Sequence, residues 1–310
     1  MTYKILVTPR SFGKHSQRPM QLLKEKGFHV KKNPYGKILT EDQMIEQVKD
    51  VDGVIIGVDP LNQKVLQHAN KLKAISKYGV GLDNIDLDYT KKHNIAVSIA
   101  SDTNTDAVAD YTFALMMAAA RRVAHIDKEC RKLNWEKITT IDISNKTLGL
   151  IGLGNIGKKV SRRAQGFDME VLAYDLNPDY EYSRNNGISY VDSLEEILKK
   201  SDFISLHLPL NAHTNHIIGS HQFDIMKSNS VIVNTARGGL IDEQALFNAL
   251  QYNKIWGAGI DVFESEPPKN TEMLNMENIV VGSHCAASTV EAIDNMGITA
   301  SKNIIGNLLR

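Results

Sequence analysis

The sequence predicts an α/β protein made of two doubly wound parallel-sheet domains, one inserted into the other. Its 310 residues exceed the comfortable size of a single hydrophobic core. Short β-rich runs alternate with helical segments, which is the pattern of parallel strands joined by helical crossovers. A glycine cluster at 148–159, "LGLIGLGNIGKK", lies near the middle of the chain. A substantial domain must therefore precede it.

Composition argues against several classes of partner. Lys+Arg and Asp+Glu each number 36, so the chain has no electrostatic footprint for nucleic acid or an anionic membrane. Cys130 and Cys285 are far apart and lack metal-ligand neighbours, which predicts neither a disulfide framework nor a metal site. The longest uncharged apolar run, "YTFALMMAAA", is well short of the ~20 residues that span a bilayer. We expect a soluble, cytoplasmic protein.

The first domain is predicted from four β-rich runs. They lie at 4–9, 53–57, 72–79 and 95–100 and are separated by helical sequence. The tail at 288–310 is helical and is expected to pack back on this domain. Residues 1–100 and 287–310 are therefore assigned to one flavodoxin-like domain.

The segment from Thr105 to Trp135 is predicted to form one long helix. It contains neither Gly nor Pro, with acidic residues early and basic residues late, as the helix dipole favours. Its first half is apolar on nearly every face rather than along one stripe. Either a subunit interface covers part of it, or the helix is buried inside one subunit.

The second domain, assigned to residues 101–286, opens with the glycine cluster. Further strands are expected at 170–175, 202–208, 230–234, 257–262 and 278–282. With the strand that leads into the cluster, these runs predict a second doubly wound sheet, of the Rossmann type.

The glycine cluster has the spacing of a dinucleotide-binding turn. The three glycines are Gly152, Gly154 and Gly157, and Asn155 and Ile156 lie between the last two. The cluster joins a strand to a helix whose N-terminus would face an anion. Asp175 ends the next strand, 18 residues after Gly157 (175 − 157). A carboxylate there accepts hydrogen bonds from the adenosine ribose and repels a 2′-phosphate. Because "LNPDY" after it offers no Arg or Lys, the sequence favours NAD over NADP.

Three polar residues follow strand ends where ligands of an open α/β sheet bind. They are Arg237, Glu266 and His284. Arg237 can bind a carboxylate through two hydrogen bonds and polarise a neighbouring carbonyl. His284 can exchange a proton with the carbonyl oxygen while hydride moves to or from nicotinamide, and Glu266 can orient the imidazole. This combination suits hydride transfer at a 2-hydroxy or 2-oxo acid.

Several motifs, in order, resemble those of the D-2-hydroxyacid dehydrogenases, and most of all the phosphoglycerate dehydrogenase branch. They are "KYGVGLDNIDL", "TDAVADYTFALMMAAARR", "GLIGLGNIG", "NTARGGLIDEQAL", "GAGIDVFESEP" and "GSHCAAST". The resemblance covers essentially the whole chain. It implies a substrate domain built from both chain ends, an inserted NAD domain, and a homodimer formed through the helix around 105–134.

The resemblance also implies roles for individual residues. The family's catalytic Arg, Glu and His fall on Arg237, Glu266 and His284. Its substrate-carboxylate loop falls on Tyr78, Gly79, Val80 and Gly81, whose N–H groups would act beside Arg237 and His284. Cofactor contacts are implied for Asp261 at the nicotinamide amide, for His207, Pro209 and Thr214 at the adenosine half, and for Ala236 in the same groove.

The chain departs from the family at positions that bear on the substrate. Phosphoglycerate-specific members often carry an Arg in the loop after the strand at 53–57, where this chain has "VDPLNQ". Lys77, just before the glycine loop, is then the nearest cation for a phosphate. The substrate is expected to be 3-phosphoglycerate or a related acid such as hydroxypyruvate or glyoxylate. Because the chain stops at Arg310, the regulatory C-terminal domains of longer relatives are not expected.

Two alternatives keep the fold. One is a phosphite- or formate-type dehydrogenase, although formate enzymes place a Gln where this chain has Glu266. The other is an NAD(H)-sensing binding protein of the co-repressor type, which keeps the catalytic residues but carries extra interaction surfaces and disordered tails.

Overall fold

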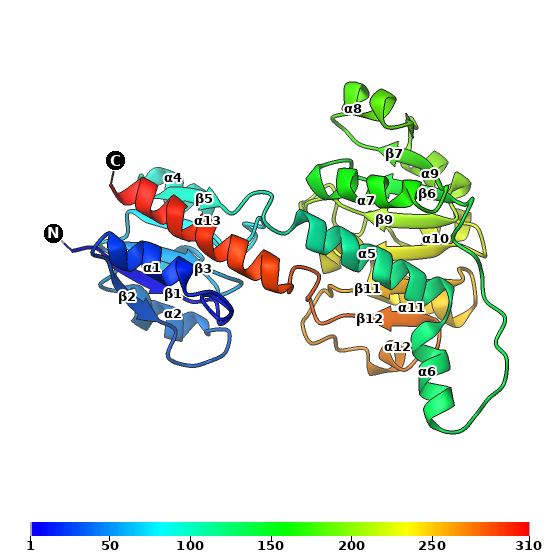
Figure 1. The fold of residues 1–310 in the computed structure, drawn as a ribbon, viewed down its shortest axis with the longest axis horizontal. Coiled ribbons are helices and arrows are strands. Elements are labelled where there is room, and N and C mark those ends of the chain that lie inside the picture. The colour runs from blue at the N-terminus through cyan, green and yellow to red at the C-terminus, as the bar shows by residue number, and fades with distance from the viewer. Residues whose placement is uncertain (1, 310) are drawn as a thin grey trace. The chain divides into compact units, whose positions relative to one another are not determined.

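The computed structural model describes residues 2–309 and divides into two compact units (Figure 1). Unit 1 contains the chain up to Asn104 and again from Ser288 onward, and unit 2 is Thr105–Ala287. Each unit is built on a parallel sheet flanked by helices, so the predicted fold class is confirmed. Among the described residues, no helix combines the length and apolar character needed to cross a membrane.

Unit 1 has a five-stranded sheet with the order β2-β1-β3-β4-β5. Helices α1 and α13 pack on one face, and α2 and α3 supply the core on the other. The strands are β1 (Lys4–Val7), β2 (His29–Lys32), β3 (Gly53–Ile56), β4 (Ala74–Lys77) and β5 (Ala96–Ile99). The helices are α1 (Arg18–Glu25), α2 (Glu41–Val48), α3 (Gln63–Leu66), α4 (Leu87–Lys92) and the C-terminal α13 (Val290–Leu308).

Unit 2 has a seven-stranded sheet with the order β12-β11-β10-β9-β6-β7-β8. Helices α5 and α7 cover one face, and α9, α10 and α11 cover the other (Figure 1). The strands are β6 (Thr147–Ile151), β7 (Glu170–Tyr174), β8 (Ile188–Tyr190), β9 (Phe203–Leu206), β10 (Val231–Asn234), β11 (Gly257–Ile260) and β12 (Ile279–Val281). The helices are α5 (Thr105–Ala120), α6 (Val123–Arg131), α7 (Asn155–Gln165), α8 (Tyr180–Asn185), α9 (Leu194–Lys200), α10 (Ser220–Ile225), the 3₁₀ turn η1 (Gly238–Leu240), α11 (Glu243–Gln251) and α12 (Thr271–Leu274).

The prediction of one helix over 105–135 is wrong, because the chain breaks between α5 and α6. Arg122 has φ 51° and ψ 30°, a left-handed conformation that ends the first helix. That conformation costs an L-residue about 1–2 kcal/mol. The Arg122 guanidinium offsets this cost by lying 4.8 Å from the centre of the Trp256 ring and donating to the Trp256 carbonyl at 3.1 Å. Because Trp256 is distant in the sequence, the residues around Arg122 do not by themselves indicate the break.

Helix α5 packs closely on the sheet because β11 has small side chains. β11 has the sequence Gly-Ala-Gly-Ile, and a Cβ placed on Gly259 would lie 2.8 Å from the Leu115 Cβ of α5. Most apolar residues of α5 are buried in this way within unit 2. The helix therefore owes its all-round apolar character mainly to burial inside one subunit.

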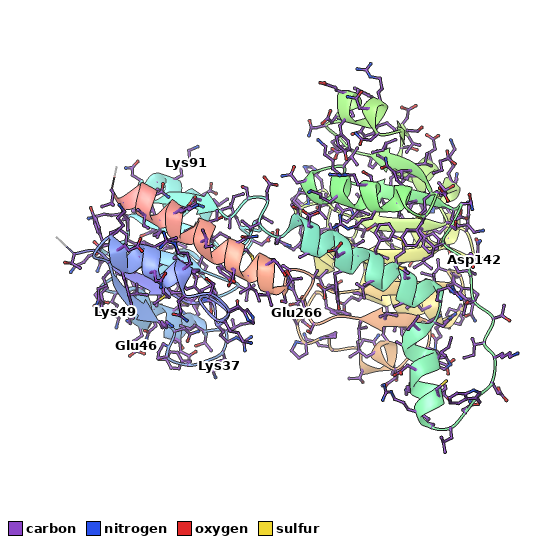
Figure 2. All side chains as sticks on the ribbon, viewed as in Figure 1. Lys37, Glu46, Lys49, Lys91, Asp142 and Glu266 are labelled. Carbon is purple, nitrogen blue, oxygen red and sulfur yellow. The ribbon has the colours of Figure 1, made fainter. Side chains whose placement is uncertain are left out.

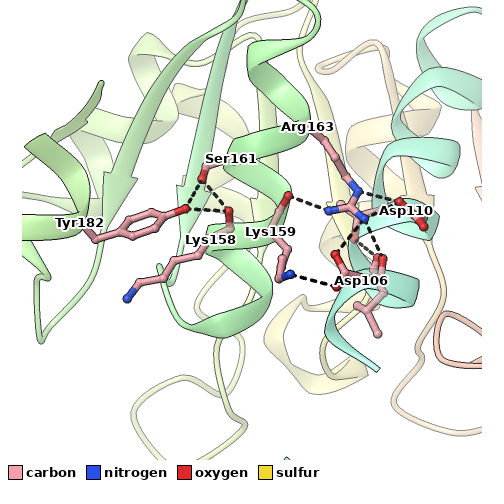
Figure 3. A network of polar contacts seen from close by, with 9 residues as sticks. Asp106, Asp110, Lys158, Lys159, Ser161, Arg163 and Tyr182 are labelled. Carbon is pink, nitrogen blue, oxygen red and sulfur yellow. Dashed lines mark hydrogen bonds and ion pairs between the residues drawn. The ribbon is translucent and has the colours of Figure 1, made fainter. Parts of the chain in front are cut away.

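Ion pairs attach the start of α5 to α7. Arg163 of α7 contacts Asp106 and Asp110, and Lys159 lies 2.9 Å from Asp106 (Figure 3). The hydrogen bond from Lys159 lowers the pKa of Asp106, so this carboxylate remains charged. Each exposed pair stabilises the protein by less than about 1 kcal/mol. Together they orient α5 against the helix that follows the glycine cluster.

We expect Gly259→Ala to lower the unfolding free energy of unit 2 by about 1–3 kcal/mol, because the added methyl group overpacks the α5–β11 contact. Urea denaturation followed by tryptophan fluorescence measures this, since both tryptophans, Trp135 and Trp256, belong to unit 2. Gly166→Ala is the control, because a Cβ there meets only the Arg163 carbonyl at 3.4 Å. Equal stability of the two variants would contradict the close contact.

Candidate active site

Three neighbouring strands bring the predicted catalytic residues to one edge of unit 2. Strands β10, β11 and β12 are adjacent and parallel, with Asn234 opposite Ile260 and Ile260 opposite Val281. Their carboxyl ends therefore lie side by side. Arg237 follows β10, Glu266 lies in the loop after β11 (Figure 2), and His284 follows β12.

Glu266 and His284 form a hydrogen-bonded pair. The Nδ1 atom of His284 lies 2.9 Å from Oε2 of Glu266, and both side chains are about two-fifths exposed. The other carboxylate oxygen of Glu266 accepts the N–H of Phe263 at 3.3 Å, which fixes the glutamate within its own loop. With Nδ1 engaged, Nε2 is the ring nitrogen that can exchange a proton with a substrate.

A buried carboxyl group holds the turn that carries His284. Asp261 is 1% exposed, and its two oxygens accept the backbone N–H groups of Cys285 at 3.0 Å and Ala286 at 2.9 Å. The Asp261 carbonyl accepts the N–H of His284 at 2.8 Å. His284 itself has φ 56°, a conformation that these hydrogen bonds stabilise. Asp261 is therefore a positioning residue, a role that the sequence did not reveal.

Arg237 is held by a residue that the sequence analysis missed. The side chain of Asn234, the last residue of β10, donates to the Arg237 carbonyl at 2.8 Å and accepts the Ala236 N–H at 3.0 Å. Nη1 of Arg237 donates to the Ala236 carbonyl at 2.7 Å. Gly238 lies directly against the backbone of Phe263, where a Cβ would clash. The Arg237 turn thus packs on the loop that carries Glu266.

The glycine cluster has the conformation that an anion site at a helix N-terminus requires. Gly152 has φ 97°, and a Cβ there would lie 2.7 Å from the His207 carbonyl oxygen. A Cβ on Gly157 would clash with the Gly152 carbonyl, whereas one on Gly154 would meet nothing within 4 Å. Gly154 is the N-cap of α7 and has no side chain to cap the helix itself, and the positive end of the helix dipole there suits an anion. These features fit a dinucleotide pyrophosphate.

The remaining predicted cofactor residues lie around this loop or lock neighbouring turns. Asp175 accepts the N–H of Leu153 at 2.8 Å through Oδ2, which places its carboxylate against the glycine loop. The Thr214 hydroxyl donates to the Pro209 carbonyl at 2.7 Å and stabilises the turn after β9. His207 bonds to Ser205 at 2.9 Å through Nε2, and burial lowers the pKa of His207 to about 4. The imidazole is therefore neutral at neutral pH.

In unit 1, the predicted substrate loop follows β4. The prediction that the Tyr78 N–H is available to a substrate is wrong, because it donates to the Ile56 carbonyl at 2.8 Å. The N–H groups of Gly79, Val80 and Gly81 have no hydrogen-bond partner among the described residues. Gly79 has φ 135°. Three successive N–H groups in such a turn suit a carboxylate.

Tyr78 instead anchors this loop. Its hydroxyl donates to the Ile293 carbonyl of α13 at 2.8 Å, and burial raises the pKa of Tyr78 to about 12. Its ring packs at 6.0 Å from that of Phe12. The tyrosine therefore remains protonated and structural across the physiological pH range.

The sequence is similar to one family of domains and to individual proteins of known families. Residues 113–286 match the family described as D-isomer specific 2-hydroxyacid dehydrogenase, NAD binding domain. A glyoxylate reductase of Korarchaeum cryptofilum is 40% identical over 270 residues, which are 84% of this chain and 81% of that protein. The chain belongs to the D-2-hydroxyacid dehydrogenase family.

Another relative within the family is longer. A D-3-phosphoglycerate dehydrogenase of Methanocaldococcus jannaschii is 40% identical over 269 residues, which are 86% of this chain. The aligned part is 51% of that protein, so the chain spans about half of its length.

Solved structures of similar proteins share both units of the fold. A D-lactate dehydrogenase of Aquifex aeolicus complexed with NAD and lactic acid has a TM-score of 0.86 and 29% identity, over 98% of this chain and 95% of that one. An acyclic imino acid reductase in complex with NADPH and D-Arg has a TM-score of 0.87 and 30% identity, over 99% and 97%. For this D-2-hydroxyacid dehydrogenase family member, NAD is the cofactor, as the sequence predicted.

Because the pKa of His207 is low in the folded protein, we expect the unfolding free energy to decrease at acidic pH. The unfolded chain takes up a proton on this imidazole near pH 6.5, whereas the folded protein does so only near pH 4. The unfolding free energy therefore falls as the pH drops between these values, by about 1 kcal/mol at pH 5.5. We expect His207→Gln to lose less thermal stability than the wild type between pH 7.5 and 5.5.

The control for this experiment is His213→Gln, since His213 is exposed in the same loop region. Its loss of stability between the two pH values should match that of the wild type. If the His207 variant and the wild type showed the same pH dependence of the melting temperature, the lowered pKa of His207 would be refuted.

Proposed function

We propose that the protein catalyses NAD-dependent hydride transfer at C2 of small, unphosphorylated 2-oxo and D-2-hydroxy acids, of which glyoxylate and hydroxypyruvate are the leading candidates. The observation that supports this most is the Glu266–His284 pair. It lies at the same edge of the sheet as the glycine loop after β6 and next to the Arg237 turn.

Each residue has a defined role in the proposed reaction. Arg237 binds the substrate carboxylate and polarises the adjacent carbonyl. In the reducing direction His284 gives its Nε2 proton to the carbonyl oxygen, while bound NADH supplies the hydride that C2 receives. Glu266 accepts the hydrogen bond of Nδ1 and stabilises the protonated imidazole that exists before the transfer. In unit 1, the successive N–H groups of Gly79, Val80 and Gly81 are suited to carboxylate oxygens.

The state of Lys77 supports an unphosphorylated substrate. Lys77 is the cation next to the glycine loop, but it is only 6% exposed. Its ammonium donates to the Gly57 carbonyl at 2.7 Å and to Oδ1 of Asn84 at 2.6 Å. These hydrogen bonds hold the loops after β3 and β4 together. Lys77 is therefore buried and already engaged within unit 1, which disfavours its use as a phosphate ligand.

We expect the purified protein to oxidise NADH at about 1 per second or faster with at least one acid from a panel of glyoxylate, hydroxypyruvate, 3-phosphohydroxypyruvate and branched 2-oxo acids. The kcat/KM for an unphosphorylated acid should exceed that for the phosphorylated one. His284→Ala should lower kcat by about 10²–10⁴ with NADH binding retained, because the proton donor is lost.

The matched control is His216→Ala. His216 also pairs with a glutamate, Glu264, at 2.9 Å and is similarly exposed, yet it lies in the turn after β9. Its kcat should stay near the wild-type value. Binding of NADH without turnover of any acid would favour the sensing protein of the co-repressor type. Turnover of phosphite or formate instead would favour the other alternative.

A second copy of the chain is the proposed partner. Helix α6 has no buried residue, and the segment after it exposes large apolar side chains: Leu133 is 87% and Trp135 77% exposed. The long connection to β6, with Asp142 along it, extends from the body of unit 2 (Figure 2). Exposed apolar groups on one protruding segment favour a subunit interface. The dimer contact then centres on α6 and residues 132–138 rather than on α5.

We expect Leu133→Glu together with Trp135→Glu to convert a dimer into a monomer in analytical ultracentrifugation, because the contact would bury two new charges. Tyr180→Glu, which changes an exposed aromatic residue on α8 away from this segment, should leave the dimer intact. A wild-type protein that sediments as a monomer at micromolar concentration would overturn the proposed partner.

A further inference from the structure

A cation reaches the loop after β7 from a neighbouring helix. Lys158 is in the first turn of α7, and its Nζ atom lies 2.6 Å from Oδ2 of Asp179. The ammonium also lies 4.7 Å from the centre of the Tyr182 ring. Lys158 extends from the side of α7 that faces Tyr182, while Lys159 and Arg163 turn toward α5 (Figure 3). The loop itself contains no Arg or Lys between Asp175 and Tyr182.

This loop adjoins the expected position of the adenosine ribose. Asp175, at its start, contacts the glycine loop through the N–H of Leu153 and also accepts the N–H of Asn177 at 2.9 Å. Asp179, at its end, accepts the N–H of Tyr182 at 3.0 Å through Oδ1 and so caps α8. The backbone of the loop is therefore fixed at both ends. The Lys158 ammonium is held beside it by Oδ2 of Asp179.

We propose that Asp179 is a second determinant of the preference for NAD, because it pairs with Lys158, a cation beside this loop that a 2′-phosphate could bind. Asp175 repels the 2′-phosphate directly. Asp179 acts indirectly. It pairs with the Lys158 ammonium, so this positive charge does not attract a 2′-phosphate. The proposal rests on the NAD site in unit 2, and it does not depend on which acid the protein reduces.

The chemistry of the pair supports this role. A phosphomonoester carries a charge near −2 and binds strongly to an unpaired ammonium. The hydrogen bond from Lys158 lowers the pKa of Asp179, so the carboxylate competes with the phosphate throughout the neutral pH range. The lysine stem is flexible, and release from Asp179 would let the ammonium move toward the ribose. The NADPH-bound imino acid reductase of the same fold shows that this architecture accommodates a 2′-phosphate.

The test compares nucleotides that differ only in the 2′-phosphate. Asp179→Asn removes the charge and keeps Oδ1 as the cap of α8. Calorimetric titration with adenosine 2′,5′-bisphosphate and with 5′-AMP gives the ratio of their affinities without requiring turnover. We expect this ratio to rise about tenfold in the variant, as for a partly exposed ammonium that gains a phosphate. The kcat/KM ratio of NADPH to NADH should rise in parallel.

Two further variants identify the cation. In the Asp179→Asn background, Lys158→Met should return the ratio to the wild-type value, whereas Lys159→Met should leave it raised because Lys159 faces α5. An unchanged ratio in Asp179→Asn, or a raised ratio that survives the loss of Lys158, would overturn the proposal. Failure to turn over any 2-oxo acid would overturn the proposed function alone, since the titration is independent of it.

Discussion

The geometry of the candidate active site depends on the buried carboxyl group of Asp261. Asp261 lies directly after β11, and both of its oxygens accept backbone N–H groups of the turn after β12. Gly282 permits this approach, because a Cβ there would clash with the carboxyl group and lie 2.8 Å from the Tyr111 hydroxyl. The residue directly after β11 thus determines the path of the chain that presents His284 to Glu266. Loss of Asp261 would leave two N–H groups unpaired in a dry environment.

The fold class, the family and the cofactor were predictable because their signals are local or repetitive. Buried strands are apolar runs, and "GLIGLGNIG" followed by Asp175 contains a complete phosphate-binding turn within thirty residues. Two of the edge strands, β2 and β8, were missed. β2 and β8 are short and partly exposed, so "HVKK" and "ISY" lack the apolar run that identifies a central strand.

The features that sequence could not predict come from contacts between residues distant in the chain. The break at Arg122 depends on Trp256, and the burial of Lys77 depends on Asn84 and Gly57. The cation beside the loop after β7 comes from Lys158, about twenty positions earlier. The roles of Arg237, Glu266 and His284 followed from their places after strands. Their assignment as catalytic residues stays a prediction, although the structure pairs Glu266 with His284.

The neutral state of His207 has a consequence for how the protein holds a dinucleotide. The side chain nearest to Gly157 carries no charge, and the cation of the first turn of α7 is already paired. Attraction for the pyrophosphate then comes from oriented backbone amides and the helix dipole, which are fixed parts of the fold. Such attraction releases few counterions. The affinity for NAD should therefore depend only weakly on ionic strength, in contrast to sites that bind phosphates through clusters of lysine and arginine.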